Sequence, residues 1–345
     1  MSKIIDNDLK YILNETKSLL NEVNGKTIFI TGGTGFFGKW LLDFFLYLNN
    51  NTKIKCQLIV LSRNPNEFLK EYNKFNVPFI QFLKGDILTF DYNQLTNIDY
   101  IIHAATDADA KLNSENPLLM LETITIGTKR ILDFAKNQEN LKSFLLTSSG
   151  AIYGKQPQNI AKTKETDSFP IDINTSTSAY AEGKRIAELY SAIYSSQHNV
   201  PIKIARCFAF VGPYLPLDKH FAVGNFISDV LSKRETLIKG DGTALRSYMY
   251  ASDLVIWLLT ILIKGENNVP YNVGSDVAIS IFDLATLVNK NQIEPKEIKV
   301  LGLKDNNRPI EQYIPSITRG IETLNLKLTV SLEEAIQRTL QFHQE

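Results

Sequence analysis

Two side chains with acid–base chemistry stand four residues apart in the segment Tyr180-Ala-Glu-Gly-Lys184. On a helix this spacing places the phenol and the ammonium on one face, one turn apart. A tyrosine ionises near pH 10, so a base that works near neutrality needs its pKa lowered by roughly three units, or about 4 kcal/mol. A cation about 6 Å away supplies only about 3 kcal/mol at an effective dielectric near 20. We therefore expect this phenol to donate a proton to a carbonyl that is being reduced, unless an additional positive charge lies nearby.

Two hydroxyl side chains, Ser148 and Ser149, follow an apolar run that is typical of a buried strand. Catalytic groups of parallel sheets gather at the carboxyl ends of the strands. The pattern Tyr-x-x-x-Lys is frequent on helices, so its functional meaning comes from these serines, which we expect beside it.

A glycine-rich loop, Thr31-Gly-Gly-Thr-Gly-Phe-Phe-Gly38, lies between a β-branched run and an amphipathic segment. Gly32 permits a tight turn, Gly35 lets the backbone approach a pyrophosphate, and Gly38 lets helix and strand pack closely. The amino terminus of the following helix adds free N–H groups and a partial positive charge. The loop therefore predicts a dinucleotide site, formed by Gly32, Thr34, Gly35, Phe36, Phe37 and Gly38.

The end of the second predicted strand, Leu61-Ser62-Arg63-Asn64, indicates which dinucleotide binds. An NAD site usually has Asp or Glu at this point to hold the adenosine ribose hydroxyls. Such an acid would repel a 2′-phosphate, whereas Ser62 and Arg63 can contact one. The missing acid favours NADP(H), and NAD(H) is the alternative.

Short apolar runs alternate with amphipathic stretches along most of the chain. This alternation predicts an α/β fold, with a Rossmann-type doubly wound parallel sheet covered by helices on both faces. Strands are expected at 26–31, 58–61, 79–83, 100–103, 143–146 and 202–208, and helices at 6–23, 37–47, 67–73, 117–136, 179–196 and 252–264.

The pattern breaks in two places, which suggests how the chain is divided. Residues 155–178 lack periodicity and form a long loop, of a kind that is often functional. We expect residues 1–211, together with roughly 247–274, to form the dinucleotide-binding domain, including the N-terminal helix. Residues 212–246 and 275–345 would form a smaller, mixed α/β C-terminal lobe for the substrate.

The composition limits the partners of this chain. Its 37 basic and 37 acidic side chains balance, and no Lys/Arg cluster with interleaved aromatics occurs, which argues against nucleic acid. Cys56 and Cys207 lie in apolar runs and the four histidines lack ligand spacing, so we expect neither a disulfide nor a metal site. The apolar run 254–263 is too short to span a membrane and the amino terminus lacks a signal peptide, which predicts a cytoplasmic protein.

Taken together, the motifs resemble those of the extended short-chain dehydrogenase/reductases that act on nucleotide sugars. This NAD(P)-dependent family includes epimerases, dehydratases and 4-ketoreductases. The resemblance covers nearly the whole chain, and its motifs are specific as a set rather than singly. It rests on the glycine loop, Gly85-Asp-Ile87, His103-Ala-Ala105, Thr147-Ser-Ser-Gly-Ala-Ile-Tyr-Gly154, Tyr180-x-x-x-Lys184, Arg206, Gly212-Pro213, Gly240-Asp-Gly-Thr-x-x-Arg246, Tyr271-Asn-Val-Gly274 and Arg308-Pro309.

The resemblance implies a role for each matching residue. Tyr180 would be the acid/base, Lys184 would bind the nicotinamide ribose, and Ser149 would hydrogen-bond the sugar oxygen at the reacting carbon, C4. Further cofactor contacts would come from Asp86, Ile87, Ala104, Ala105, Thr106 and Thr147. Arg246 and Arg308 would hold the diphosphate, with an interlobe salt bridge as the alternative for either. The other candidates for the nucleotide-sugar substrate are Tyr153, His220, Asn225 and Tyr248.

Gly150 and Ala151 depart from the pattern of the 4,6-dehydratases in this family. Those enzymes carry an Asp-Glu pair here, which moves protons during water elimination. Neither glycine nor alanine can transfer a proton, so we do not expect the standard dehydratase reaction. Ile124 and Ala209 replace asparagines that are common in the family, which leaves the placement of the substrate open.

The leading hypothesis is an NADPH-dependent 4-ketoreductase, which would reduce C4 of a nucleoside-diphosphate 4-keto-6-deoxyhexose in deoxysugar and polysaccharide biosynthesis. The first alternative is a 4-epimerase with tightly held NAD, in which Tyr180 removes and returns one proton. The second is a non-catalytic dinucleotide sensor. The resemblance also implies a homodimer, with helices 117–136 and 179–196 forming a four-helix interface. The nucleobase, the sugar and the stereochemistry of the product stay open.

Overall fold

A parallel sheet of seven strands forms the centre of the molecule, in the order β11-β6-β5-β4-β1-β2-β3. The computed structural model describes residues 2–106, 110–219, 221–292, 294–305 and 309–345, so His220 and Arg308 lie outside the described residues. The strand order reverses between β1 and β4, which confirms the predicted doubly wound α/β fold. The strands are β1 (Thr27–Thr31), β2 (Gln57–Ser62), β3 (Ile80–Lys84), β4 (Tyr100–His103), β5 (Ser143–Ser149), β6 (Ile202–Cys207) and β11 (Pro270–Val273).

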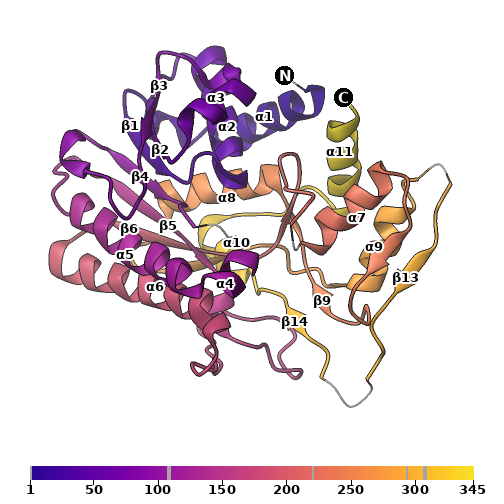
Figure 1. Ribbon diagram of the computed structural model, residues 1–345. Coiled ribbons are helices and arrows are strands. Elements are labelled where there is room, and N and C mark those ends of the chain that lie inside the picture. The colour runs from indigo at the N-terminus through magenta and orange to yellow at the C-terminus, as the bar shows by residue number, and fades with distance from the viewer. Residues whose placement is uncertain (1, 107–109, 220, 293, 306–308) are drawn as a thin grey trace.

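Helices cover both faces of this sheet (Figure 1). On one face, α1 (Lys3–Thr16), α2 (Phe36–Asn51) and α8 (Ala251–Lys264) bury a core that includes Trp40 and Trp257. On the other face, α5 (Pro117–Ala135) and α6 (Ala179–His198) form a second core. Neighbouring residues of β1 divide between the two cores, because successive side chains of a strand point to opposite faces. The remaining helical segments here are α3 (Pro65–Glu71), α4 (Ala110–Glu115) and the 3₁₀ turns Asn73–Phe75, Tyr92–Gln94, Gly150–Tyr153 and Ser176–Ser178.

The chain after β6 builds three small sheets in its described part. They are β7 (Phe210–Val211) with β10 (Met249–Tyr250), β8 (Thr236–Ile238) with β13 (Ile298–Val300), and β9 (Leu245–Arg246) between β12 (Ile279–Ser280) and β14 (Gln312–Tyr313). A third core lies among these sheets and α7 (Ala222–Leu231), α9 (Ile281–Asn289) and α11 (Leu332–Gln344), at the right of Figure 1. The short helix α10 (Thr318–Leu324) packs instead against β11 and α8. The domain bounds expected from the sequence stay a prediction.

The N-terminal helix differs from the sequence prediction. One helix over 6–23 was expected, but α1 ends at Thr16 and a separate 3₁₀ turn follows at Leu20–Val23. Lys17 and Leu19 donate to the carbonyls three residues before them, so i−3 bonds replace the helical i−4 ladder at this point. Helix α1 packs against α2 and α8, and Leu20 and Val23 of the turn are buried in the same core. The apolar pattern therefore identified the buried side chains correctly and the length of the helix wrongly.

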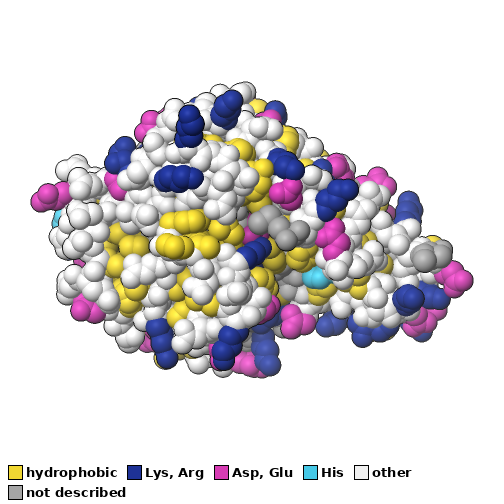
Figure 2. Space-filling view, turned by 90° about the horizontal axis from the view of Figure 1, so that it is seen from above, with side chains coloured by type: hydrophobic (Ala, Val, Ile, Leu, Met, Phe, Trp, Pro, Cys, Tyr) yellow, Lys and Arg dark blue, Asp and Glu magenta, His cyan; other side chains and the backbone are white. Residues whose placement is uncertain are grey.

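Charged side chains of both signs are interspersed on the face shown in Figure 2, and hydrophobic side chains gather there in a band. This mixture agrees with the equal numbers of basic and acidic residues. Within the described ranges, no helix combines the length and apolar character that crossing a bilayer requires.

A buried carboxylate links the two ends of the chain. Asp8 of α1 is 2% exposed, accepts a hydrogen bond from Tyr250 at 2.6 Å and pairs with Arg338 of α11. Burial raises the pKa of Asp8 to about 6, although Tyr250 and Arg338 lower it. The folded chain therefore holds this proton more tightly than the unfolded chain does.

We expect Asp8 to lower the free energy of unfolding by at most about 3 kcal/mol as the pH rises from about 4 to about 6. The reason is that the Asp8 carboxyl loses its proton at a lower pH in the unfolded chain than in the folded chain. Urea unfolding of wild type and Asp8→Asn across this range measures the contribution as a difference between the two curves. The wild type should lose stability relative to the variant as pH rises. Parallel curves would show that Asp8 does not titrate as expected.

Candidate active site

Ser149, Tyr180 and Lys184 come together at the carboxyl end of β5. Ser149 is the last residue of this strand, and the other two lie in the first turns of α6. The Lys184 Nζ donates to the Thr147 carbonyl at 2.9 Å and to the Thr106 hydroxyl at 3.2 Å, and lies 5.9 Å from the centre of the Tyr180 ring. The ammonium is therefore fixed beside the phenol rather than bonded to it.

The surroundings of this group favour a protonated tyrosine. Burial raises the pKa of Tyr180 to about 12, while its hydrogen bond with Ser149 lowers it. Burial also lowers the pKa of Lys184 to about 8, with nearby Glu188 among the groups that raise it. Near neutral pH the chain alone thus presents a protonated phenol and a predominantly charged ammonium, a pair suited to giving a proton to a substrate oxygen.

The glycine loop packs tightly against the ends of two strands. Gly32 has a φ of +73°, and a Cβ there would lie 2.3 Å from the Ala104 carbonyl oxygen. A Cβ on Gly38 would lie 2.2 Å from the backbone of Gly33. Helix α2 begins directly after Gly35, so its first N–H groups face the loop. A side chain larger than hydrogen therefore does not fit at Gly32 or Gly38 without a shift of the backbone. Ala104, Ala105 and Thr106 follow β4 beside this loop, and the binding of a pyrophosphate there stays a prediction.

The buried side chain of His103 links the elements beneath this loop. Its ring nitrogens hydrogen-bond to the hydroxyls of Thr31 at 2.8 Å and Thr128 at 3.1 Å, and burial lowers its pKa to about 3. The imidazole is therefore neutral. It ties β1, β4 and α5 together beneath the site, while the Thr147 hydroxyl donates to its backbone carbonyl at 3.1 Å.

The residues expected around the adenosine lie at the neighbouring ends of β2 and β3. Ser62 is buried at the end of β2, and its carbonyl accepts from Gly85 at 2.9 Å. Arg63 is exposed, Asp86 accepts from the Leu88 amide at 2.9 Å, and Ile87 is buried. The structure thus brings this predicted set together, and the choice between the two dinucleotides stays a prediction.

Replacing Gly38 by Ala should weaken dinucleotide binding by at least about tenfold, a loss of 1.4 kcal/mol or more. The added Cβ meets backbone atoms of Gly33, which cannot move aside without opening the loop. Fluorescence titration with NADPH and with NADH gives the affinity, and thermal unfolding gives the stability. Gly240→Ala is the matched control, because a Cβ there meets nothing within 4 Å. Unchanged affinity in Gly38→Ala would contradict the role given to the loop.

The space beside Gly150 is filled by aromatic side chains. A Cβ on this residue would lie 2.6 Å from the Phe208 ring and 2.7 Å from the Tyr313 hydroxyl. The packing around Gly150 therefore excludes an acidic side chain at this position, because a carboxylate would displace the rings of Phe208 and Tyr313.

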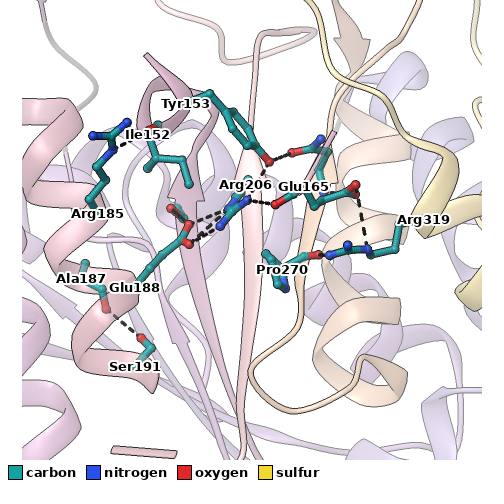
Figure 3. A network of polar contacts seen from close by, with 12 residues as sticks. Ile152, Tyr153, Glu165, Arg185, Ala187, Glu188, Ser191, Arg206, Pro270 and Arg319 are labelled. Atoms are coloured by element: carbon teal, nitrogen blue, oxygen red, sulfur yellow. Dashed lines mark hydrogen bonds and ion pairs between the residues drawn. The ribbon is translucent and has the colours of Figure 1, made fainter. Parts of the chain in front are cut away.

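A buried polar network supports β5 and α6 from behind (Figure 3). Ser148 and Arg206 face each other on β5 and β6, and both bind Glu188 of α6, one turn after Lys184. The guanidinium also donates to the Tyr153 hydroxyl at 2.9 Å and to the Glu165 carbonyl at 2.8 Å. The network continues to β11 through the Tyr153–Asn272 bond of 2.6 Å and the Asn272 amide, which donates to the Glu165 carboxylate.

The predicted substrate residues lie in different surroundings. Tyr153 is buried, and its hydroxyl both donates and accepts within the network. Arg246 of β9 pairs with Glu311 at 3.2 Å, and Tyr248 is buried between β9 and β10. Asn225 lines a separate cavity of about 590 Å³ between α7 and the segment 237–244. These assignments stay predictions.

Sequence reasoning missed three residues of the site: Glu188, Phe208 and Tyr313. Only Glu188 could have been predicted from the sequence, because it lies four positions after Lys184 and therefore on the same face of the helix. Phe208 and Tyr313 belong to no motif. In the described part of the chain, no group of His, Cys, Asp and Glu is arranged to hold a metal ion.

Comparison with known proteins adds relatives with named activities. Residues 28–274 match the family model described as the NAD dependent epimerase/dehydratase family. The chain is 31% identical over 314 residues to UDP-glucuronic acid decarboxylase 5 of Arabidopsis thaliana, which covers 90% of this chain and 86% of that protein. It is 30% identical over 315 residues to decarboxylase 2 of that plant, covering 90% and 67% of the two chains. The UDP-glucose 4-epimerase of Thermotoga maritima shares the fold, with a TM-score of 0.78, 24% identity and coverage of 92% and 98%.

Proposed function

The chain belongs to the NAD-dependent epimerase/dehydratase family, and on that premise we propose that it is an enzyme acting at C4 of a nucleoside-diphosphate sugar. Its reaction is the reduction of the C4 ketone of a 4-keto-6-deoxyhexose. The observation that carries this choice is the protonated Tyr180 beside Ser149, with no proton-transferring side chain at Gly150 or Ala151. A site built in this way can give one proton to O4, and positions 150 and 151 supply no acid or base for eliminating water.

The residues divide the work of reduction as follows. The nicotinamide dinucleotide would supply the hydride when bound, and Lys184, which lies beside Thr106, would hold its ribose. The Ser149 hydroxyl hydrogen-bonds the ketone oxygen and stabilises the negative charge that develops on it. Tyr180 donates its phenolic proton to that oxygen, so that C4 gains one hydride and O4 one proton. Arg246 would release Glu311 to bind the diphosphate, for which the guanidinium fork is suited.

The cofactor proposed for this reaction is NADPH. Support comes from Ser62 at the end of β2, where an acid for the ribose hydroxyls is missing, and from Arg63 beside it. A reductase must exchange its cofactor in every cycle, whereas an enzyme that returns the hydride to the sugar can keep it bound.

A reaction that leaves the cofactor unchanged is the alternative. The relatives named UDP-glucuronic acid decarboxylase and the structural neighbour named UDP-glucose 4-epimerase favour it. In such a reaction Tyr180 would first remove the O4 proton and later return it. With its pKa raised to about 12, that removal would require the charge of an oxidised nicotinamide nearby.

The deciding experiment follows NADPH and NADH absorbance while the protein meets nucleotide-linked 4-keto-6-deoxy sugars, UDP-glucose and UDP-glucuronate. Stoichiometric oxidation with a keto sugar, faster with NADPH, supports the reductase. Absence of oxidation with every keto sugar overturns it. UDP-galactose or carbon dioxide formed from the last two substrates, with NAD released on denaturation, would then identify the redox-neutral enzyme.

We further propose that the chain forms a homodimer through α5 and α6. Their outer surfaces expose Leu118 (64%) and Leu189 (59%), with Ile126 and Ile193 also partly exposed. Apolar side chains on neighbouring helices form a patch that a second copy can bury. Light scattering should give twice the mass of the chain, and Leu189→Glu should halve it. A wild-type monomer at micromolar concentration would contradict the proposal.

A further inference from the structure

The first turn of α6 carries Tyr180, so the bonds that hold the start of this helix also set where the phenol lies. The first four N–H groups of a helix have no partner within the helix itself. Ser178 is the N-cap residue, but its side chain caps no amide of α6 and donates instead to the Asp172 carbonyl at 2.6 Å. The adjacent chain therefore leaves the Tyr180 amide to a partner from another element.

Asn113 of α4 is that partner. Its Oδ1 accepts a hydrogen bond from the Tyr180 amide at 3.1 Å, and its Nδ2 donates to the Thr177 carbonyl at 2.7 Å. A side-chain amide can do both because it has an acceptor oxygen and a donor nitrogen. The two bonds lie on either side of Ser178, where the 3₁₀ turn ends and α6 begins. Figure 1 shows α4 beside this end of α6.

The same part of the chain also contacts Lys184. Thr106 lies seven positions before Asn113, and its hydroxyl accepts from the Lys184 Nζ at 3.2 Å. The Thr147 carbonyl of β5 accepts from the same ammonium at 2.9 Å, so the lysine has two fixed partners. Loss of the Asn113 bonds would therefore loosen the turn that carries Tyr180 and leave the lysine anchored.

We propose that Asn113 is a positioning residue for the reaction at C4: its bonds to the Tyr180 amide and the Thr177 carbonyl keep the Tyr180 phenol beside Lys184 at the end of β5. The inference rests on the proposed function, in which that phenol gives its proton to O4. A proton donor must lie within hydrogen-bond distance of the oxygen that accepts the proton. A small displacement of a reacting group lowers the rate, even when its cause lies outside the reacting atoms.

Asn113→Ala removes both bonds. We expect kcat to fall about five- to tenfold with KM nearly unchanged, the size of effect that one helix cap supports. Asn116→Ala is the matched control, because Asn116 caps α5 by accepting from the Leu119 amide at 3.2 Å. Both variants should show a similar small decrease in melting temperature, and the control should keep the wild-type kcat. A raised KM with unchanged kcat in Asn113→Ala, or an equal loss of kcat in both variants, would overturn the proposal.

The placement of the phenol can also be measured without a sugar. NMR of the ¹³C-labelled tyrosines in the unliganded protein gives the Tyr180 ring signal, which is assigned by its loss in Tyr180→Phe. Asn113→Ala should broaden this signal or move it towards that of an exposed tyrosine, and Asn116→Ala should leave it unchanged. A wild-type signal in Asn113→Ala would refute the positioning role. This measurement gives an answer even if the proposed 4-ketoreductase activity is absent, so the two proposals can fail separately.

A double-mutant cycle with Tyr180→Phe tests the route. If Asn113 acts through the phenol, Asn113→Ala should lower the residual rate of Tyr180→Phe no further. An undiminished effect in that background would show that Asn113 acts through another group, and the proposal would fall.

Discussion

Replacing Tyr180 by Phe is expected to lower kcat by roughly 10²- to 10⁴-fold, the usual contribution of a positioned proton donor. The variant keeps the ring that lies beside Lys184 and loses only the hydroxyl that carries the proton. Dinucleotide affinity and thermal stability should stay close to those of the wild type, because the substitution leaves the glycine loop and the buried network unchanged. Steady-state kinetics with the substrate found in the absorbance assay gives kcat.

Tyr190→Phe is the matched control, since this tyrosine lies on the same helix and is also partly buried. It should keep the wild-type rate. If Tyr180→Phe also kept that rate, proton donation by Tyr180 would be refuted, and the chain would have to be reconsidered as a non-catalytic dinucleotide sensor.

Replacing Arg206 by Ala is expected to cost about 3–5 kcal/mol of stability, because it leaves the Glu188 carboxylate without its partner. Both side chains are only 12% exposed, and the guanidinium additionally holds Tyr153 and the Glu165 carbonyl. Since folded domains are stable by about 5–15 kcal/mol, a loss of this size is a large part of the total. Urea unfolding followed by circular dichroism measures it.

The double variant Arg206→Met with Glu188→Gln tests whether the unpaired Glu188 charge causes the loss of stability. If the penalty comes from the unpaired charge, removing that charge should restore part of the lost stability. Lys10→Ala serves as the control, because it breaks an exposed pair with Asp6 and should leave the unfolding midpoint unchanged. A midpoint for Arg206→Ala equal to that of the wild type would mean that the network does not stabilise the fold.

The sequence by itself determined the parts of this protein that depend on short-range patterns. The alternation of apolar runs identified the strands and helices of the doubly wound sheet, because periodicity of two or near 3.6 residues is a local property. The glycine loop and the Tyr180/Lys184 pair were found in the same way, since a turn and a helical face are set by residues a few positions apart. The end of α1 at Thr16 was missed, because an apolar stripe continues equally well through a helix or a 3₁₀ turn.

Only the tertiary structure decided which distant groups share the site. Glu165 and Asn272, joined in one network, are 107 positions apart, and no periodicity relates them. The contact of Tyr313 with the Ser149–Gly150 turn likewise depends on how β14 is placed against β5, which no local pattern specifies. The same holds for Arg246, which the sequence suggested for a diphosphate and which the fold pairs with Glu311. The physical reason is that burial and charge pairing are settled by the packing of whole elements, whereas helices, strands and turns are settled by neighbours along the chain.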